Sequence, residues 1–470
     1  MSTIKQLAPP MRRLCSHHLL AVVSALLLAA AAVPESAAQW GWGSGGGDHA
    51  PLVSPLANDP ATSLYTISIM DGGGPLVVDL AGDLVWSACA PGHPTFSCGS
   101  AECAAAAGST CPEQGQRRPW QQDYGAGAVI DGVGDRQCTC TARACDPTAR
   151  ARAQCAAGDL TSFAMSASAT DGRNALRPVA FEAVGACAPE PDWLLPAGGH
   201  ATGVAGFGRG APLSLPSQLA ARRGLGRRFA LCLPGVAIFG DTPIYLGSYP
   251  PDLMTTIAST PLVSRNNHTS AGAGGYYLPV EAISVSWPSW GVAATRAALP
   301  AGALELDATT GRGGVALSTV TRYTAMRPDV YRAVAQAFGD AIGRPGYVRP
   351  APAVPPFSLC YDTASLRHVR VLGWDVPSIH LELGAGASMN WTMGSGNSMV
   401  QVGDDGALCL AFVEMRGAAA DPAAPAVVIG GYQVEDNLLV FDEDEEVLHF
   451  SGLLWGSGAT CSGFNFTAPR

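Results

Sequence analysis

The chain has few charged residues and no excess of positive charge. Charged side chains make up 14% of its 470 residues, and 38 acidic residues outnumber 28 basic ones, which gives a net charge of −10. Because nucleic-acid binding requires a basic face for the phosphates, this balance argues against a nucleic-acid partner. The one dense basic cluster, ARRGLGRR at 221–228, follows a short helix-like segment, and we interpret it as the solvated end of that helix.

The chain also lacks an apolar run long enough to span a bilayer. The apolar run Leu19–Val33 is about 15 residues long, whereas a membrane-spanning helix needs roughly 20. Lys5 and two arginines precede this run, and small residues follow it at 36–38. That pattern is typical of a secretory signal, so we expect residues 1–38 to be removed before Gln39 and the chain to be exported without a membrane span.

Glycine and proline are abundant, with 56 and 36 residues, which favours frequent turns between short strands over long helices. The sequence therefore predicts an all-β protein, long enough for two lobes with separate cores. We expect a leader at 39–62, an N-terminal lobe at 63–245 and a C-terminal lobe at 260–470. Each half has an apolar strand that runs into a glycine-rich turn, which suggests internal duplication.

Two segments of the C-terminal lobe give clear local predictions. Asp329 near the start of PDVYRAVAQAFGDAI, and the spacing of its apolar residues, predict a helix at 328–342. The acidic run DEDEE at 442–446 lies between the apolar stretches LLVF and VLHF, so it is interpreted as a hairpin turn and not as an acidic binding tail.

The 14 cysteines point to disulfide bonds. Cys15 lies in the signal, and eight of the others lie between Cys89 and Cys155, a density typical of exported proteins. The spacings repeat no CxxC pair and only His93 is nearby, so no metal site is expected; an odd number of cysteines leaves at least one thiol unpaired. Sequons predict glycosylation at Asn267, Asn390 and Asn465.

Two segments resemble the cleft turns of the pepsin-like aspartic proteases of plants. VVDLAGDLVW at 77–86 is similar to the first Asp-Thr-Gly segment and its Ser-Asp-Leu-Val-Trp sequel, and GGVALSTVTRYTAM at 313–326 is similar to the second. The resemblance covers nearly all of the chain after residue 38. It implies a bilobal pepsin-like fold, with two β-barrel lobes of the six-stranded type around a central cleft.

The same resemblance implies that the catalytic pair is incomplete. Asp79 stands at the first aspartate position, but Leu80 and Ala81 replace the threonine and glycine, and Ser318 stands where the second aspartate belongs. The reaction needs one ionised and one protonated carboxyl group, and a serine hydroxyl can take neither role. Asp307 in DATTG is the remaining candidate for a second carboxylate, although no apolar strand precedes it.

A flap tyrosine is missing as well. Gly158-Asp159-Leu160 matches the strand after the flap, but the preceding segment has no aromatic residue, and Tyr124 is more than 30 residues away. Blocks such as RFALCLPG, FSLCYDT and VIGGYQVEDNLLVFD are similar to the subgroup of xylanase inhibitors, seed basic globulins and dermal glycoproteins. That subgroup implies a secreted protein of the cell wall that has lost cleft chemistry and binds a microbial glycoside hydrolase.

By this resemblance, Thr321 is a candidate partner contact, because it aligns with the leucine that follows the second turn in the xylanase inhibitors. Leu454 and Trp455 are apolar and lie just beyond a hairpin. They are candidate partner contacts as well, or they close the core of the C-terminal lobe. The resemblance also implies the disulfides Cys360–Cys409, Cys98–Cys103 and Cys187–Cys461. Two features depart from the xylanase inhibitors: the segment 451–461 has no histidine, and His449 lies inside a strand.

The sequence thus predicts a monomeric, exported, non-catalytic protein of plant defence, without a cofactor, that binds or inhibits a microbial glycoside hydrolase. Two alternatives from other classes stay open. One is an aspartic endopeptidase with residual activity, and the other is a storage or wall-structural protein. The target, the pairing within 89–155 and processing into two subunits are also open.

Overall fold

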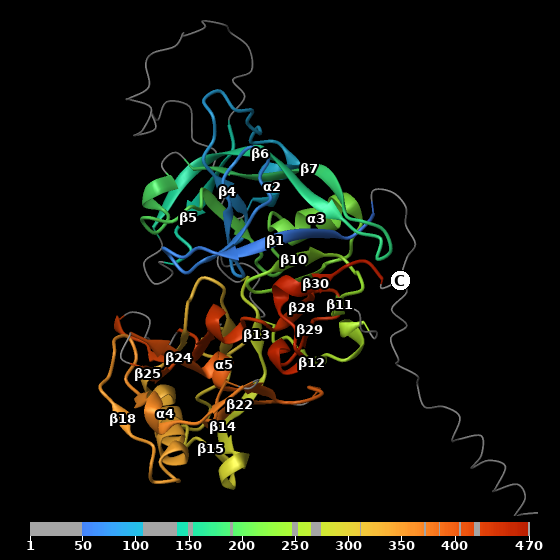
Figure 1. Ribbon diagram of the computed structural model, residues 1–470. Coiled ribbons are helices and arrows are strands. Elements are labelled where there is room, and N and C mark those ends of the chain that lie inside the picture. Colours follow the sequence, from blue (N-terminus) through green and yellow to red (C-terminus); the bar gives the residue numbers. More distant parts are fainter. Residues whose placement is uncertain are drawn as a thin grey trace, which may run out of the picture. The chain divides into compact units, whose positions relative to one another are not determined.

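The structure is a computed structural model, and it describes residues 49–106, 139–148, 154–188, 191–246, 252–264, 274–310, 312–370, 373–384, 386–403, 406–417 and 424–468. All of these belong to one compact unit, Ser44–Arg470. The secondary structure is dominated by short strands (Figure 1). No helix in the described ranges is both long and apolar enough to cross a lipid bilayer.

The strands of the N-terminal half are β1 Leu52–Asn58, β2 Tyr65–Ile67, β3 Leu76–Asp79, β4 Val85–Ser87, β5 Thr141–Cys145, β6 Cys155–Ala169, β7 Arg177–Cys187, β8 Gly203–Gly206, β9 Arg228–Cys232, β10 Val236–Phe239 and β11 Tyr245–Leu246. Among the described residues, the α-helices are α2 Ala101–Ala105, α3 Leu215–Arg223, α4 Pro328–Ile342 and α5 Ser395–Ser398. Helix α4 has the bounds that its apolar spacing predicted.

The strands of the C-terminal half are β12 Ala258–Pro261, β13 Tyr277–Leu278, β14 Val280–Trp287, β15 Val292–Arg296, β16 Val315–Leu317, β17 Thr324–Met326, β18 Pro350–Ala351, β19 Cys360–Asp362, β20 His368–Val369, β21 Gly373–Trp374, β22 Ser378–Leu383, β23 Trp391–Met393, β24 Met399–Val402, β25 Ala407–Leu410, β26 Phe412–Glu414, β27 Val427–Ile429, β28 Leu438–Asp442, β29 Val447–Phe450 and β30 Phe464–Asn465.

Each half contains the same five-strand motif. The order β2-β3-β8-β4-β7 in the first half corresponds to β13-β16-β27-β17-β26 in the second. In both, the successive pairings are antiparallel, parallel, antiparallel and parallel. The central strands are buried on both faces, which suits their runs of valine and leucine. This repeated topology supports the internal duplication that the sequence suggested.

The sheets differ between the halves. Strands β1–β10 belong to one continuous 13-stranded sheet, whereas the C-terminal motif forms its own five-stranded sheet. Strands β28 and β29 form the hairpin predicted around the acidic run, and this hairpin joins the large sheet through β9 and β12. The end of the chain therefore pairs with the N-terminal half. Stacked rings of Phe229 and Phe441, 4.7 Å apart, fill the core at this junction.

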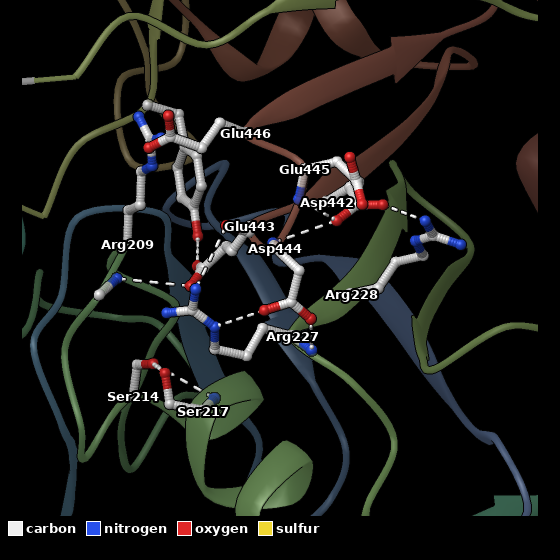
Figure 2. Close-up of polar contacts among 12 residues, drawn as sticks. Arg209, Ser214, Ser217, Arg227, Arg228, Asp442, Glu443, Asp444, Glu445 and Glu446 are labelled. Atoms are coloured by element: carbon white, nitrogen blue, oxygen red, sulfur yellow. Dashed lines mark hydrogen bonds and ion pairs between the residues drawn. The ribbon is translucent and has the colours of Figure 1, made fainter.

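The basic and acidic clusters of the sequence lie against each other (Figure 2). Arg227 binds Asp444 at 2.8 Å, and Arg228 forms an ion pair with Asp442. The prediction that the basic cluster is only a solvated helix end is therefore wrong for its last two arginines. They stabilise the hairpin turn, because opposite charges from β9 and β28 meet at the end of the shared sheet.

Several disulfides join the described residues: Cys89–Cys187, Cys103–Cys140, Cys145–Cys155, Cys232–Cys461 and Cys360–Cys409. The last one is a pairing that the family resemblance implied.

The implied pairings Cys98–Cys103 and Cys187–Cys461 are wrong. Helix α2 carries Cys103 to Cys140. Strand register places Ser87 beside Cys187, so Cys89, two residues further on, reaches Cys187. Cys461 bonds Cys232 instead, which still links the end of the chain to the N-terminal half.

Gln433 supplies a test of the C-terminal core. It is fully buried, its oxygen accepts hydrogen bonds from the backbone N–H and hydroxyl of Thr324, and its amide donates to the carbonyls of Asn397 and Ala411. Gln433→Leu leaves these buried groups unpaired, so we expect a loss of about 3 kcal/mol or more in unfolding free energy, measured by urea unfolding. The matched change at exposed Gln401, Gln401→Leu, should alter it by less than about 0.5 kcal/mol. Equal losses would contradict this assignment.

Candidate functional site

Asp79 ends strand β3 and begins the first turn of the candidate site. Its backbone carbonyl accepts a hydrogen bond from the N–H of Gly82, and its carboxylate accepts one from the N–H of Ala81, both at 3.0 Å. A β-carbon at Gly82 would lie 2.9 Å from Cα of Gly206 and 3.2 Å from the Asp79 carboxylate, so the turn requires glycine there. The Asp79 side chain is buried.

Ser318 follows strand β16 and begins the second turn. Its N–H donates to the carbonyl of Ile429, on the neighbouring parallel strand. Its hydroxyl donates to the Thr321 hydroxyl at 3.0 Å and accepts from the Thr321 N–H at 3.2 Å. The second turn therefore closes on itself through two neutral side chains. Residues 318–321, Ser-Thr-Val-Thr, contain no carboxylate.

Thr319 joins the two turns. Its hydroxyl donates to the carbonyl of Val78 at 2.5 Å and accepts from the N–H of Leu80 at 3.3 Å. The residue in the matching position of the first turn is Leu80, which has no hydroxyl to return these bonds. The connection between the lobes at this point therefore depends on one threonine.

Both turns carry a buried apolar side chain where the active family has a threonine or a glycine. Leu80 is buried in the main core cluster, which includes residues of both halves. Val320, at the position of a family glycine, is buried in a cluster with Val77, Leu84 and Trp86 of the N-terminal half. These side chains fill the space around the turns, so the junction is suited to holding the lobes together.

A chain of buried hydrogen bonds connects the first turn to Glu443. The carbonyl of Asp79 accepts from the N–H of Phe207 at 2.8 Å, and the Tyr276 hydroxyl lies 2.9 Å from the Phe207 carbonyl. The same hydroxyl lies 2.5 Å from the carboxyl group of Glu443, within the acidic turn of Figure 2. The sequence did not predict this contact, because it assigned Glu443 only to a hairpin turn, and a turn gives no sign of a distant partner such as Tyr276.

Burial raises the pKa of Glu443, although the Tyr276 hydroxyl and two nearby arginines favour its ionised form. One tyrosine hydrogen cannot serve both the carbonyl of Phe207 and an ionised Glu443. When Glu443 is protonated, its carboxyl O–H can donate a hydrogen bond to the Tyr276 oxygen. The Tyr276 O–H can then donate to the carbonyl of Phe207.

Arg322 and Glu435 continue the site away from the second turn. The Arg322 guanidinium lies 3.0 Å from the Glu435 carboxylate, and the Tyr65 hydroxyl donates to that carboxylate at 2.6 Å. Burial and the Glu435 charge raise the pKa of Tyr65 well above its usual value. The guanidinium also lies over the rings of Tyr323 and Tyr432, at 5.6 and 5.4 Å. This network fixes β2 of the first half to the segment after Thr321.

The two residues proposed as partner anchors have different exposures. Leu454 is 2% exposed, so its side chain cannot contact a partner, and the alternative that it completes the core is supported. Trp455 is 45% exposed, and its indole N–H donates to Asp436 at 2.7 Å. Asp436 directly follows Glu435. The exposed indole is therefore held on the same segment as the Arg322 network.

Asp307 does not complete a pair through its contacts. Its carboxylate is exposed and accepts hydrogen bonds from Thr309 and Thr310 within its own turn, which lower its pKa.

The segment that the resemblance assigned to the flap precedes Gly158 of β6. There, β5 and β6 form an antiparallel pair that is joined by Cys145–Cys155. Tyr124 and Asn267 lie outside the described residues.

Cys89, His93 and Cys187 form a group of possible metal ligands within the described residues. Their two sulfur atoms are bonded to each other, so in this oxidised form the group offers a metal only the imidazole. His449 lies in β29 between Ser259 and Val440 of the neighbouring strands, and burial lowers its pKa. These contacts favour a structural role in the sheet.

The buried Glu443 predicts a pH dependence. Because its folded-state pKa is raised above the ordinary 4.5, its contribution to stability is complete below about pH 4.5 and is lost as pH rises through the folded-state value. Glu443→Gln removes this titration. We therefore expect the melting temperature of Glu443→Gln, relative to that of the wild type, to increase as the pH rises above about 4.5.

The measurement is the melting temperature of the wild type and of Glu443→Gln at pH values below and above about 4.5. Glu445→Gln, at an exposed position of the same turn, is the control. A difference between Glu443→Gln and the wild type that stays constant with pH would contradict the assignment.

The comparisons agree with this geometry. The family profile described as Xylanase inhibitor N-terminal matches residues 65–241, and the one described as Xylanase inhibitor C-terminal matches 275–452. The chain is 43% identical to the protein named Chitinase CLP of Oryza sativa subsp. japonica, over 89% of this chain and 92% of that protein. It is 29% identical to the Probable aspartic proteinase GIP2 of Nicotiana benthamiana, over 89% and 92% of the two chains.

Solved structures show the same fold. The crystal structure of edgp matches with a TM-score of 0.71 and 29% identity, over 89% of this chain and 98% of that one. Basic 7S globulin from soybean matches with a TM-score of 0.63 and 25% identity, over 88% of this chain and 100% of that one. With its bilobal all-β fold, its degenerate second turn and its matches in both halves, this chain belongs to the xylanase-inhibitor family of pepsin-like proteins.

Proposed function

We propose that this protein is exported to the cell wall and acts there by binding and inhibiting a microbial glycoside hydrolase, without hydrolysing peptides. The observation that carries the proposal is the second turn. Ser318 takes the place of the second aspartate, and its hydroxyl is bound to Thr321 within the same turn.

Peptide hydrolysis by this fold needs two carboxyl groups that share a proton. One takes a proton from water and the other polarises the peptide carbonyl. Asp79 can supply one of these groups, but a serine hydroxyl cannot supply the other. Loss of one member of a catalytic unit commonly removes about 10⁴–10⁶ of the rate, so this site is better suited to binding than to turnover.

The contact surface that we propose runs from the second turn to Trp455. Thr321 and Arg322 begin it, Glu435 and Asp436 continue it, and the exposed indole of Trp455 ends it. Aromatic and arginine side chains dominate many protein interfaces, and here both are held in place by ion pairs or hydrogen bonds. This preorganisation reduces the entropy lost on binding.

The target need not be a xylanase. In xylanase inhibitors, the segment after the last hairpin contributes a histidine that enters the cleft of the target. Residues 451–461 of this chain have no histidine, and His449 lies within strand β29 of the 13-stranded sheet. The relative named Chitinase CLP makes chitin the second polysaccharide to test. We therefore propose enzymes that cut xylan or chitin as candidate targets.

The lack of peptide hydrolysis is directly testable. The wild type should not cleave a denatured protein from about pH 3 to about pH 6, the range in which paired carboxyl groups act. Ser318→Asp should restore little activity, because Leu80 and Val320 still alter both turns and small displacements are costly to this chemistry.

An active plant pepsin-like protease serves as the positive control for peptide cleavage. Cleavage by the wild type that a transition-state analogue blocks and Asp79→Ala abolishes would overturn the non-catalytic assignment.

The binding surface is tested by inhibition of fungal xylanases and chitinases. Trp455→Ala should raise the inhibition constant of a sensitive enzyme about 30-fold, equivalent to about 2 kcal/mol. Trp193→Ala is the matched control, because Trp193 is 44% exposed and lies in the other half of the chain.

Release of sugar from chitin or xylan by the protein itself would contradict the proposal. So would failure to inhibit any enzyme of the panel, or equal effects of the two tryptophan variants.

A further inference from the structure

A groove of about 570 Å³ lies on the outer face of the C-terminal sheet that contains β14, β15, β22 and β23. It is separate from the turns and from Trp455. Its lining comes from the β14–β15 hairpin and from β22 and the residue before β23: Ser284, Ser286, Pro288, Gly291, Val292, Ala293, Ala294, His380, Glu382 and Asn390. Its volume falls within the range of about 300–1,000 Å³ that is common for small-molecule sites.

The strand register aligns a polar row across this face. Thr392 of β23 is opposite His380 of β22, His380 is opposite Ser284 of β14, and Ser284 is opposite Arg296 of β15. Because directly opposite residues share a face, these four side chains form one row perpendicular to the strands.

Hydrogen bonds hold the floor of the groove in place. Nε2 of His380 lies 2.7 Å from the Ser286 hydroxyl, and its Nδ1 lies 2.9 Å from the Thr392 hydroxyl. Glu382 is bound by Arg296 at 2.6 Å. Hydroxyl, imidazole and carboxylate groups are thus presented in a fixed arrangement, and the glycine and alanines of the hairpin leave room above them.

Asn390 stands at the end of the groove opposite the hairpin. It is exposed, it begins the sequon Asn390-Trp391-Thr392, and its side-chain oxygen accepts from the N–H of Leu383 at 3.2 Å. That bond orients the amide and turns its nitrogen, the atom that carries sugar, away from the Leu383 N–H. The groove therefore starts at an acceptor for N-linked glycosylation.

We propose that this groove is the seat of the chain's own N-linked glycan, attached to Asn390. The first two sugars of such a glycan are N-acetylglucosamines. They would cross the polar row from β23 towards the hairpin, with their hydroxyl and acetamide groups facing Ser284, Ser286 and Glu382. The inference needs the export included in the proposed function, but it does not depend on the partner or on Trp455.

The test uses the full chain secreted from plant cells in which mannose trimming is blocked, so that the glycans at Asn390 and Asn465 carry the same sugars. Mass spectrometry of glycopeptides should show sugar on Asn390. In the folded protein, an endoglycosidase that cuts between the two N-acetylglucosamines should release the Asn390 glycan about tenfold more slowly than the Asn465 glycan. This is the factor that one net hydrogen bond supplies. Asn465 is an exposed asparagine in β30 and is the internal control.

Variants distinguish a glycan that is bound in the groove from one that is released slowly only because neighbouring residues hinder the enzyme. Ser286→Ala combined with Glu382→Ala should bring release from Asn390 close to the Asn465 rate. Thr295→Ala is the matched control, because Thr295 of β15 lines a different pocket, between the sheet and α4, and should change nothing. After denaturation both glycans should be released equally.

An Asn390 that carries no sugar, or equal release from both sites in the folded wild type, would overturn the proposal. A failure of enzyme inhibition would leave these measurements unaffected, so the two proposals can fail separately.

Discussion

The hydroxyl of Thr319 is the contact on which the arrangement of the two turns depends. It lies between the carbonyl of Val78 and the N–H of Leu80, buried from solvent, and it connects the same motif in the two halves of the chain. A buried backbone group without a partner is strongly destabilising, so the two hydrogen bonds of Thr319 stabilise the close approach of the turns. Asp79 lies between Val78 and Leu80, and Ser318 directly precedes Thr319.

The residues around this contact explain how a hydrolytic arrangement can become a structural one. Leu80 and Val320 place apolar side chains where the active family has small or hydroxyl-bearing residues, and both are buried in clusters shared between the halves. The free energy gained from their burial favours a closed junction. Both turns are therefore packed by buried apolar side chains.

The sequence was informative where structure is local. Helix α4 and the β28–β29 hairpin follow from apolar spacing and from a polar turn between apolar runs. The positions of Asp79 and Ser318 follow from segments with a strong family pattern. Contacts between distant segments could not be predicted in this way. The ion pair of Arg228 with Asp442, and the contact of Tyr276 with Glu443, depend on which strands pair across the molecule. The implied pairing of Cys98 with Cys103 was wrong for the same reason, because Cys103 in α2 bonds Cys140, a cysteine of a distant segment.

The Cys232–Cys461 disulfide has a consequence for the covalent continuity of the molecule. Cys232 precedes the segment between the two lobes, and Cys461 lies near the end of the chain. The hairpin β28–β29 and strand β30 reinforce the link through pairing with β9 and β11. A protease that cut the backbone between Leu246 and Tyr276 would therefore produce two polypeptides that stay covalently joined, and only a reducing agent would separate them on a gel.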